Sequence, residues 1–105
     1  MYEDVVNGIL SVIPDKVERI ILYGSVARGD DTPESDIDIA LITRESLNRD
    51  EFARISNSNM ELGWKYEKYI SVANILEKRF SAWQNTSPFY KNIAKEGIVL
   101  WKKAG

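Results

Sequence analysis

The segment Leu22 to Ile42, which reads LYGSVARGDDTPESDIDIALI, joins two apolar runs through a polar loop. The first run starts further back, at Val17, and its β-branched residues stop at Gly24, a pattern typical of a buried strand that ends in a turn. The second run, Ile37–Ile42, has the same character. The segment therefore predicts two strands of one core with a charged connection between them.

Two carboxylates flank the start of the second run, although an apolar strand is ordinarily a poor place for them. Side chains alternate along a strand, so Asp36 and Asp38 are expected to share one face while Ile37 and Ile39 point into the core. Two negative charges repel by about 1 kcal/mol at 4 Å in water and by more beside a low-dielectric wall, which favours a bound divalent cation. Mg²⁺ fits this pattern because it needs only one or two protein carboxylates and completes its shell with water and substrate phosphates.

A Gly-Ser turn directly follows the first strand. Gly24 permits close backbone approach, Ser25 offers a hydroxyl, and the free N–H groups of a turn or helix start bind phosphate oxygens. Arg28 adds a positive charge one helical turn further on. Taken singly, a Gly-Ser turn is usually only a turn and an Asp-x-Asp pair is usually a solvated strand end. Their combination predicts a site for a nucleoside triphosphate.

Helical and strand patterns alternate through the rest of the chain. Further helices are expected over 2–13, 50–62 (ending near Gly63) and 88–96, and further strands over 68–72 and 98–101. Residues 73–86 are ambiguous, with a helical piece indicated around Phe80. Ser87 suits an N-cap and Pro88 a first helical position. This order predicts a mixed α/β (α+β) fold, a single domain over 1–105 in which helices pack on a small sheet.

Composition narrows the possible chemistry. The chain has no Cys and no His, which excludes disulfides, thiolate or imidazole metal ligands and Ser-His-Asp catalysis. Lys and Arg are spread along a chain of net charge −2, so general nucleic-acid binding is not expected. No stretch approaches the roughly 20 apolar residues of a membrane span, and no basic signal-peptide start is present. A soluble, cytoplasmic protein with no membrane partner is therefore expected.

The motif resembles that of a known family. Gly24-Ser25-x-Ala27-Arg28-Gly29 followed by Ser35-Asp36-x-Asp38 is similar to the signature of the minimal nucleotidyltransferases, the MNT domains of the DNA polymerase beta nucleotidyltransferase superfamily. The ending SPFYKNIAKEGIVLW, residues 87–101, resembles the C-terminal helix and strand of these small proteins. The resemblance covers nearly the whole chain and implies the nucleotidyltransferase fold.

The resemblance also implies an activity. It implies transfer of a nucleoside monophosphate, with AMP from ATP expected, to a hydroxyl of a partner protein, with release of pyrophosphate. Gly24 and Ser25 would then hold the phosphates, Asp36 and Asp38 would be the catalytic ligands of two Mg²⁺ ions, and Arg28 would steady the phosphate loop or its neighbouring acids. Stand-alone proteins of this kind are commonly antitoxins paired with a HEPN-domain toxin, whose tyrosine they modify, so a HEPN-domain partner is expected.

One carboxylate of that family pattern is missing. Active members usually complete the site with a third carboxylate on the following strand, whereas here Ser71 lies near that place. Glu67 is the nearest acid, and unbroken alternation would put it on the face of Tyr69 and Ser71 but about 13 Å away along the strand. Glu61 is a remoter candidate. Slow or absent catalysis is therefore the alternative expectation.

Two hypotheses of different class remain open. The first is an enzyme that adenylylates a hydroxyl of its partner. The second is an inactive binding module that keeps the fold and neutralises a toxin by occluding it, with Trp64, Trp83 and Trp101 as interface anchors, although aromatic residues at helical spacing are more often core. Transfer to RNA or to an aminoglycoside lacks support because the chain shows neither a basic groove nor an added domain.

Overall fold

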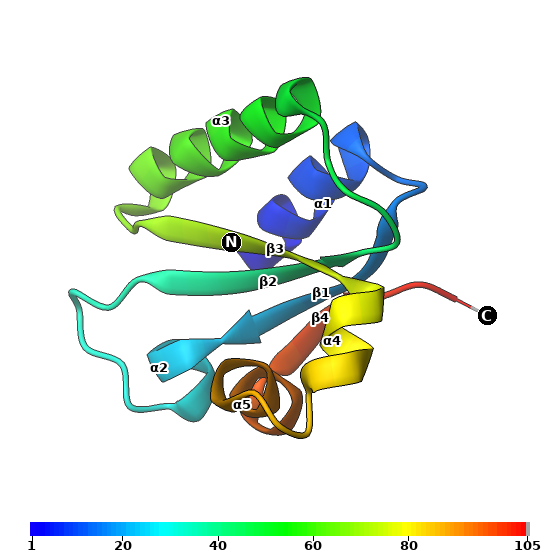
Figure 1. Ribbon diagram of the computed structural model, residues 1–105. Coiled ribbons are helices and arrows are strands. Elements are labelled where there is room, and N and C mark those ends of the chain that lie inside the picture. Colours follow the sequence, from blue (N-terminus) through cyan, green and yellow to red (C-terminus); the bar gives the residue numbers. More distant parts are fainter. Residues whose placement is uncertain (105) are drawn as a thin grey trace.

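The computed structural model describes residues 1–104 and contains a four-stranded sheet with helices on both faces (Figure 1). Its elements are α1 (Tyr2–Val12), β1 (Val17–Tyr23), α2 (Gly24–Arg28), β2 (Ile37–Thr43), α3 (Arg49–Tyr66), β3 (Ile70–Leu76), α4 (Glu77–Trp83), α5 (Pro88–Glu96) and β4 (Ile98–Lys102). The strand order across the sheet is β3-β2-β1-β4. β1 is antiparallel to both β2 and β4, whereas β2 and β3 are parallel. The predicted mixed α/β fold is confirmed.

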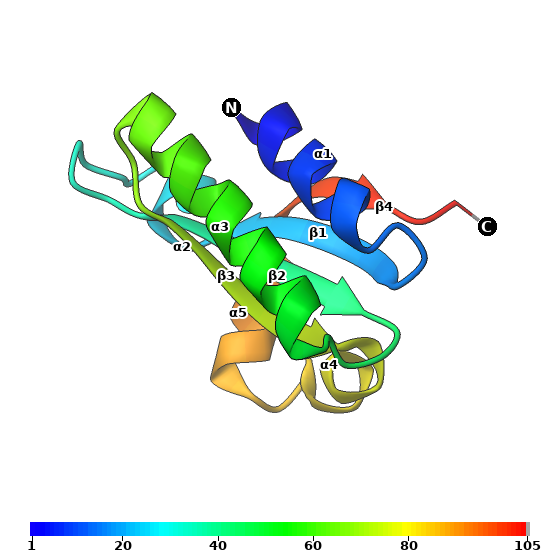
Figure 2. The same ribbon diagram turned by 90° about the horizontal axis from the view of Figure 1, so that it is seen from above.

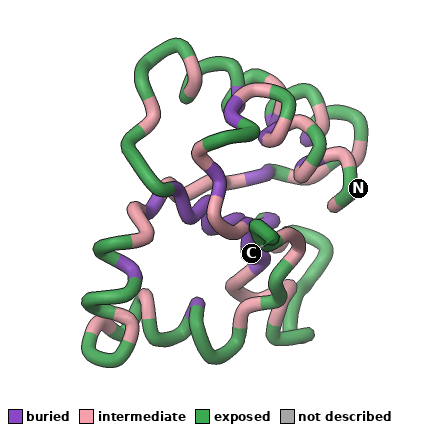
Figure 3. The backbone as a smooth tube through the Cα atoms, turned by 90° about the vertical axis from the view of Figure 1, so that its right-hand side faces the viewer, coloured by how far each residue is buried: buried purple, intermediate pink, exposed green. Residues whose placement is uncertain are grey.

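The sheet separates two apolar layers, with α1 and α3 on one face and α4 and α5 on the other (Figures 1 and 2). Alternation along β2 sends Ile37, Ile39 and Leu41 to the face of α1 and α3. It sends Ala40 and Ile42 to the face of α4 and α5. Both faces of the central strands are therefore buried, which explains their apolar runs. The exposed residues lie mainly in the loops and on the outer turns of the helices (Figure 3).

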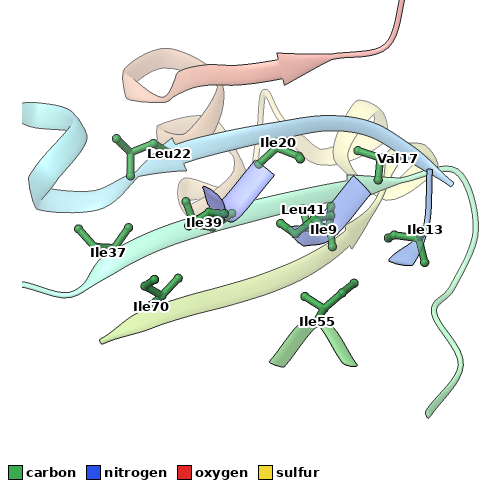
Figure 4. Close-up of a cluster of buried hydrophobic side chains, with 11 residues drawn as sticks. Ile9, Ile13, Val17, Ile20, Leu22, Ile37, Ile39, Leu41, Ile55 and Ile70 are labelled. Carbon is green, nitrogen blue, oxygen red and sulfur yellow. The ribbon is translucent and has the colours of Figure 1, made fainter. Parts of the chain in front are cut away.

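The larger layer is built from branched aliphatic side chains (Figure 4). Ile9 of α1 and Ile55 of α3 pack into one cluster with Ile20, Ile39 and Leu41 of the sheet, and each of these side chains is at most 2% exposed. Full burial of such a side chain stabilises the fold by about 1.5–3 kcal/mol. The cluster fixes β1 and β2 side by side and thereby fixes the residues at their adjoining ends. Among residues 1–104, no helix combines the length and apolar character that crossing a bilayer requires.

The α3 helix is longer than the sequence pattern predicts. It was expected to end near Gly63, but it continues to Tyr66 and stops at Glu67, whose φ is 55°. Gly63 is buried because the chain returning from the helix passes over it, and a Cβ there would lie 2.5 Å from the carbonyl oxygen of Lys68. This glycine therefore permits a close backbone contact and does not terminate the helix.

The β3 strand lies further along the chain than predicted. The expected strand 68–72 begins only at Ile70, because Glu67 ends α3 and the Lys68 N–H still donates to the Gly63 carbonyl oxygen of that helix. It then continues through 73–76, which the sequence left ambiguous, and Asn74 Nδ2 donates to the carbonyl oxygen of Leu41 at 3.1 Å and to Thr43 Oγ1 at 2.9 Å. α4 supplies the helical piece expected around Phe80.

The helix expected after Ser87 is present as α5, with Pro88 in its first turn. Ser87 occupies the predicted N-cap position, but its side chain makes no capping hydrogen bond. Proline favours this helix start, since its φ is already helical and its missing N–H is not needed there.

The N-terminus of α3 carries a capping box. Asn48 Oδ1 accepts from the Glu51 N–H at 2.8 Å, and Glu51 Oε1 accepts from the Asn48 N–H at 2.9 Å. We expect Asn48→Ala to lower the free energy of unfolding by about 1 kcal/mol, measured by urea denaturation. Asn57→Ala on the exposed part of the same helix is the matched control and should change it by less than about 0.5 kcal/mol. Equal losses in the two variants would contradict the role of the cap.

Candidate functional site

The turn after β1 lies directly against the carboxylate of Asp38. Tyr23, the last residue of β1, is the cross-strand partner of Asp38. Gly24 follows with φ 80°, and a Cβ at this position would lie 2.4 Å from Asp38 Oδ2. Both the left-handed backbone and the lack of space require glycine here. The fold thus brings the predicted phosphate turn and one predicted carboxylate into contact.

Ser25 stands in the single turn of α2, next to this contact. It is half-buried, and the helix closes when the Asp30 N–H donates to its carbonyl oxygen at 3.1 Å. The first N–H groups of any helix have no partner inside the helix, so those of α2 remain available beside Asp38. In Figure 1, α2 and the first residues of β2 lie at the same end of the sheet.

Asp36 lies just before β2, whereas Asp38 is the second residue of that strand. Its side chain is exposed, whereas Asp38 is half-buried. Burial raises the pKa of Asp38 above its ordinary value, the negative charge of Asp36 raises it further, and Arg28 lowers it. The two acids therefore interact through their charges, as the sequence predicts, although only Asp38 is held by the sheet.

Arg28 forms ion pairs with two carboxylates, those of Asp30 and Glu96. Its Nε lies 3.3 Å from Asp30 Oδ2, and its Nη1 lies 3.6 Å from Glu96 Oε2 on α5. The guanidinium is thus held near the acids of the site, while half-exposed, and offsets part of their charge. Glu96 was not singled out from the sequence because a contact between helices far apart in the chain leaves no local pattern.

Ser71 is the register partner of Asp38 in the parallel pair of β2 and β3. It therefore occupies the position at which the family resemblance led us to expect a third carboxylate. Glu67 does not share the strand face of Ser71 as unbroken alternation would require, because it ends α3 before β3 begins. Glu61 lies on the exposed surface of α3. Neither acid replaces the missing one.

The donor set suits a hard, oxygen-binding cation. Within residues 1–104, no group of three or more His, Cys, Asp or Glu side chains is arranged to hold a metal ion. Two carboxylates, Asp36 and Asp38, and a nearby hydroxyl, Ser25, match Mg²⁺, which keeps several positions for water and phosphate. They do not match a closed structural metal site, which needs four protein ligands.

Tyr23 is a site neighbour that the sequence analysis did not single out. Its ring meets that of Phe89 on α5 edge-on, with centroids 5.6 Å apart. Burial, followed by the charge of Asp38, raises the pKa of Tyr23, so the phenol stays protonated at neutral pH. Its position at the end of an apolar strand resembles that of any core aromatic, which is why the pattern gave no signal.

The raised pKa of Asp38 predicts a pH-dependent cost to stability. Between the ordinary value of 3.8 and the raised one, the folded state binds more protons than the unfolded state, so stability falls as pH rises through that interval. Asp38→Asn should therefore raise the melting temperature at pH 7 without Mg²⁺, and the gain should vanish as pH falls below 3.8. A variant that melts below the parent at pH 7 would contradict a burial penalty on this carboxylate.

Comparison with known families decides the assignment. The family model described as polymerase beta, nucleotidyltransferase matches residues 9–104. The chain belongs to the polymerase beta nucleotidyltransferase family. The match includes the Gly24-Ser25 turn, the Asp36 and Asp38 carboxylates and all four strands. It confirms the family resemblance recognised in the Gly-Ser and Asp-x-Asp motifs.

Individual relatives agree with this family membership. The protein named "Putative protein adenylyltransferase MJ0604" of Methanocaldococcus jannaschii is 34% identical over 99 residues, which cover 94% of this nucleotidyltransferase-family chain and 93% of that protein. A crystal structure of a mutant toxin–antitoxin MntA-HpeT matches with a TM-score of 0.65 at 15% identity, over 98% of this chain and 74% of that one. The MNT antitoxin complex with tri-AMPylated HEPN toxin of Shewanella oneidensis matches with a TM-score of 0.53 at 18% identity, over the same shares. At these identities the solved structures show a shared fold.

Proposed function

We propose that this chain is a Mg²⁺-dependent nucleotidyltransferase that moves AMP from ATP to a hydroxyl of a HEPN-domain partner protein, as the antitoxin of a toxin–antitoxin pair. The observation that carries the proposal is the contact between Gly24 and the Asp38 carboxylate, which joins a phosphate-binding turn to a metal-binding acid. The name of the M. jannaschii relative supports AMP transfer to protein, and the MNT antitoxin bound to an AMPylated HEPN toxin supports the choice of partner.

The proposed reaction is an in-line displacement at the α-phosphorus of ATP. The acceptor hydroxyl oxygen forms the new P–O bond, and the bond from the α-phosphorus to its bridging oxygen breaks. The bonding electrons leave with pyrophosphate, and the hydroxyl proton is released to solvent. The substrate pair therefore needs one place that holds pyrophosphate and another that admits the acceptor.

The residues of the chain divide these tasks. The backbone at Gly24 and the hydroxyl and N–H groups from Ser25 onward donate to the terminal phosphates, and Arg28 offsets their charge. Asp36 and Asp38 would hold Mg²⁺, which when bound neutralises charge on the leaving pyrophosphate and lowers the pKa of the attacking hydroxyl. Tyr23 and the core behind it keep the Asp38 carboxylate in place.

Ser71 favours a second candidate function. A hydroxyl is a poorer metal ligand and base than the carboxylate that active family members place there. A chain that binds a toxin through the same fold without transferring AMP would tolerate this serine. This candidate is an occluding antitoxin.

An adenylylation assay tests the proposal. The chain is incubated with a HEPN-domain toxin, Mg²⁺ and ATP labelled at the α-phosphate, with EDTA in the control. We expect label on the toxin only when Mg²⁺ is present, together with loss of toxin activity. Loss of toxin activity without label would contradict the enzymatic function and support the occluding antitoxin. Retention of toxin activity without label would contradict both proposed functions.

A further inference from the structure

A groove runs between α3 and the outer side of β3. It encloses about 430 Å³ and is lined from both elements. Four large side chains along it are unusually exposed: Phe52 by 48%, Met60 by 49%, Trp64 by 73% and Tyr69 by 69%. Clustered aromatic residues of this kind at a surface are typical of binding sites for other proteins.

Asn59 adds a polar group to this apolar lining. Its side chain is only 3% exposed, and its Nδ2 has no hydrogen-bond partner within residues 1–104. A buried amide without a partner carries a free-energy penalty. An occupant that offers a carbonyl oxygen to Asn59 would remove that penalty, and a peptide backbone offers one at every residue.

The groove also contains an unpaired sheet edge. Within residues 1–104, β3 pairs with β2 alone. The Ile37 N–H donates to the Tyr69 carbonyl oxygen at 2.9 Å, so Tyr69 and Ser71 turn their backbone groups toward β2. The N–H and C=O groups of Ile70 and Val72 therefore face the groove, where an extended segment can pair with them.

The groove adjoins the proposed site on the side from which an acceptor must come. The phosphate turn at Gly24 lies on the β1 side of Asp38, and Ser71 lies on its β3 side. Attacking and leaving oxygens are roughly in line during phosphoryl transfer. If pyrophosphate leaves beside Gly24, the hydroxyl approaches across β3.

We propose that the acceptor protein binds as an extended segment added to the edge of β3. This inference rests on the proposed function. Alternation along the segment places one side chain on the α3 face as an apolar anchor in the groove, beside Trp64. The next side chain falls on the opposite face, over Ser71, and carries the hydroxyl toward Asp38. The small serine leaves room for it to cross.

The test uses Trp64→Ala, with Val99→Ala as the control. Val99 is 52% exposed but lies on β4, at the opposite edge of the sheet from β3. With the HEPN-domain toxin as acceptor, Trp64→Ala should raise the acceptor concentration for half-maximal AMP transfer by about tenfold or more and leave ATP affinity unchanged. Val99→Ala should change neither quantity. Equal behaviour of the two variants would overturn the groove as the acceptor site.

Amide hydrogen exchange gives a readout that does not depend on catalysis. Binding of the HEPN-domain toxin should protect the N–H groups of Ile70 and Val72. The proposal would be overturned if the toxin does not bind, or if it binds without protecting these N–H groups. It would also be overturned if the protection appears without toxin as the concentration of the chain rises, because a second copy of the chain would then occupy the edge of β3. Protection without AMP transfer would support the groove as the docking site and contradict the proposed enzymatic activity. AMP transfer without protection would support the enzymatic activity and contradict the groove as the docking site.

Discussion

Replacing Asp36 and Asp38 together by asparagine is expected to reduce AMP transfer by about 10³-fold or more. Loss of a single charge-stabilising group in an active site typically costs 10²–10³ in rate, and here both proposed metal ligands are lost. Folding should survive, because Asp36 is exposed and the Asp38 carboxylate costs stability when ionised. The measurement is the initial rate of label transfer from ATP to the HEPN-domain toxin at saturating Mg²⁺.

Asp31→Asn is the matched control for this double variant. Asp31 is an exposed carboxylate in the same loop, and it has no ion pair within residues 1–104. Its removal should leave the rate within about twofold, since only general surface charge changes. A similar loss in the control, or a double variant with full activity, would show that the carboxylates near β2 do not form the catalytic site.

Gly24→Ala should have the second largest effect, because the added methyl group occupies the space of the Asp38 carboxylate. Its Cβ would lie 2.4 Å from Oδ2 and 3.2 Å from Cγ of Asp38, so that carboxylate or the turn must move. A misplacement of about 1 Å can cost about 10²-fold in rate, and we expect a loss of this size in AMP transfer. The variant should also lose stability, from the clash and from a left-handed backbone that costs about 1–2 kcal/mol with a side chain.

Gly29→Ala separates these two causes. Gly29 has the same φ of 80°, but a Cβ there would meet nothing within 4 Å. Its variant should show only the backbone cost in thermal denaturation and should keep AMP transfer within a few fold. If both variants lose activity equally, the close approach of Gly24 to Asp38 is not what the reaction requires.

The proposed site contains two features that cost stability. Asp38 is half-buried beside a second carboxylate, and Gly24 has a backbone that few other residues adopt. Such features persist when the surrounding structure fixes them, and here the packed β1 and β2 strands do so. Titratable groups with shifted pKa values cluster at functional sites for the same reason.

The parts of the fold that follow from local patterns were predictable. Val17–Tyr23 is a strand with the expected bounds because β-branched and aromatic residues favour a strand and Gly24 ends the run in a turn. Pro88 marked the start of α5 because its φ and missing N–H suit that position. The Gly-Ser and Asp-x-Asp motifs pointed to the two ends that β1 and β2 bring together.

The remainder depends on contacts that local patterns do not contain. Gly63 was expected to end α3, but a glycine is needed at this position because the Lys68 carbonyl oxygen packs against it. The start of β3 was misjudged because Glu67 and Lys68 carry no signal that separates a helix end from a strand start. Glu96 and the register of Ser71 against Asp38 emerge only from the folded sheet and from the packing of α5.

Nuclear magnetic resonance titration with ATP tests the central claim most directly. The amide signals of Gly24, Ser25 and Asp38 are followed in the ¹⁵N-labelled chain, once with Mg²⁺ and once with EDTA. We predict that these three signals shift together and saturate at a common ATP concentration, and that chelation of the metal weakens the binding strongly. Shifts confined to other parts of the chain, or the same affinity without a divalent cation, would contradict a shared site for magnesium and triphosphate.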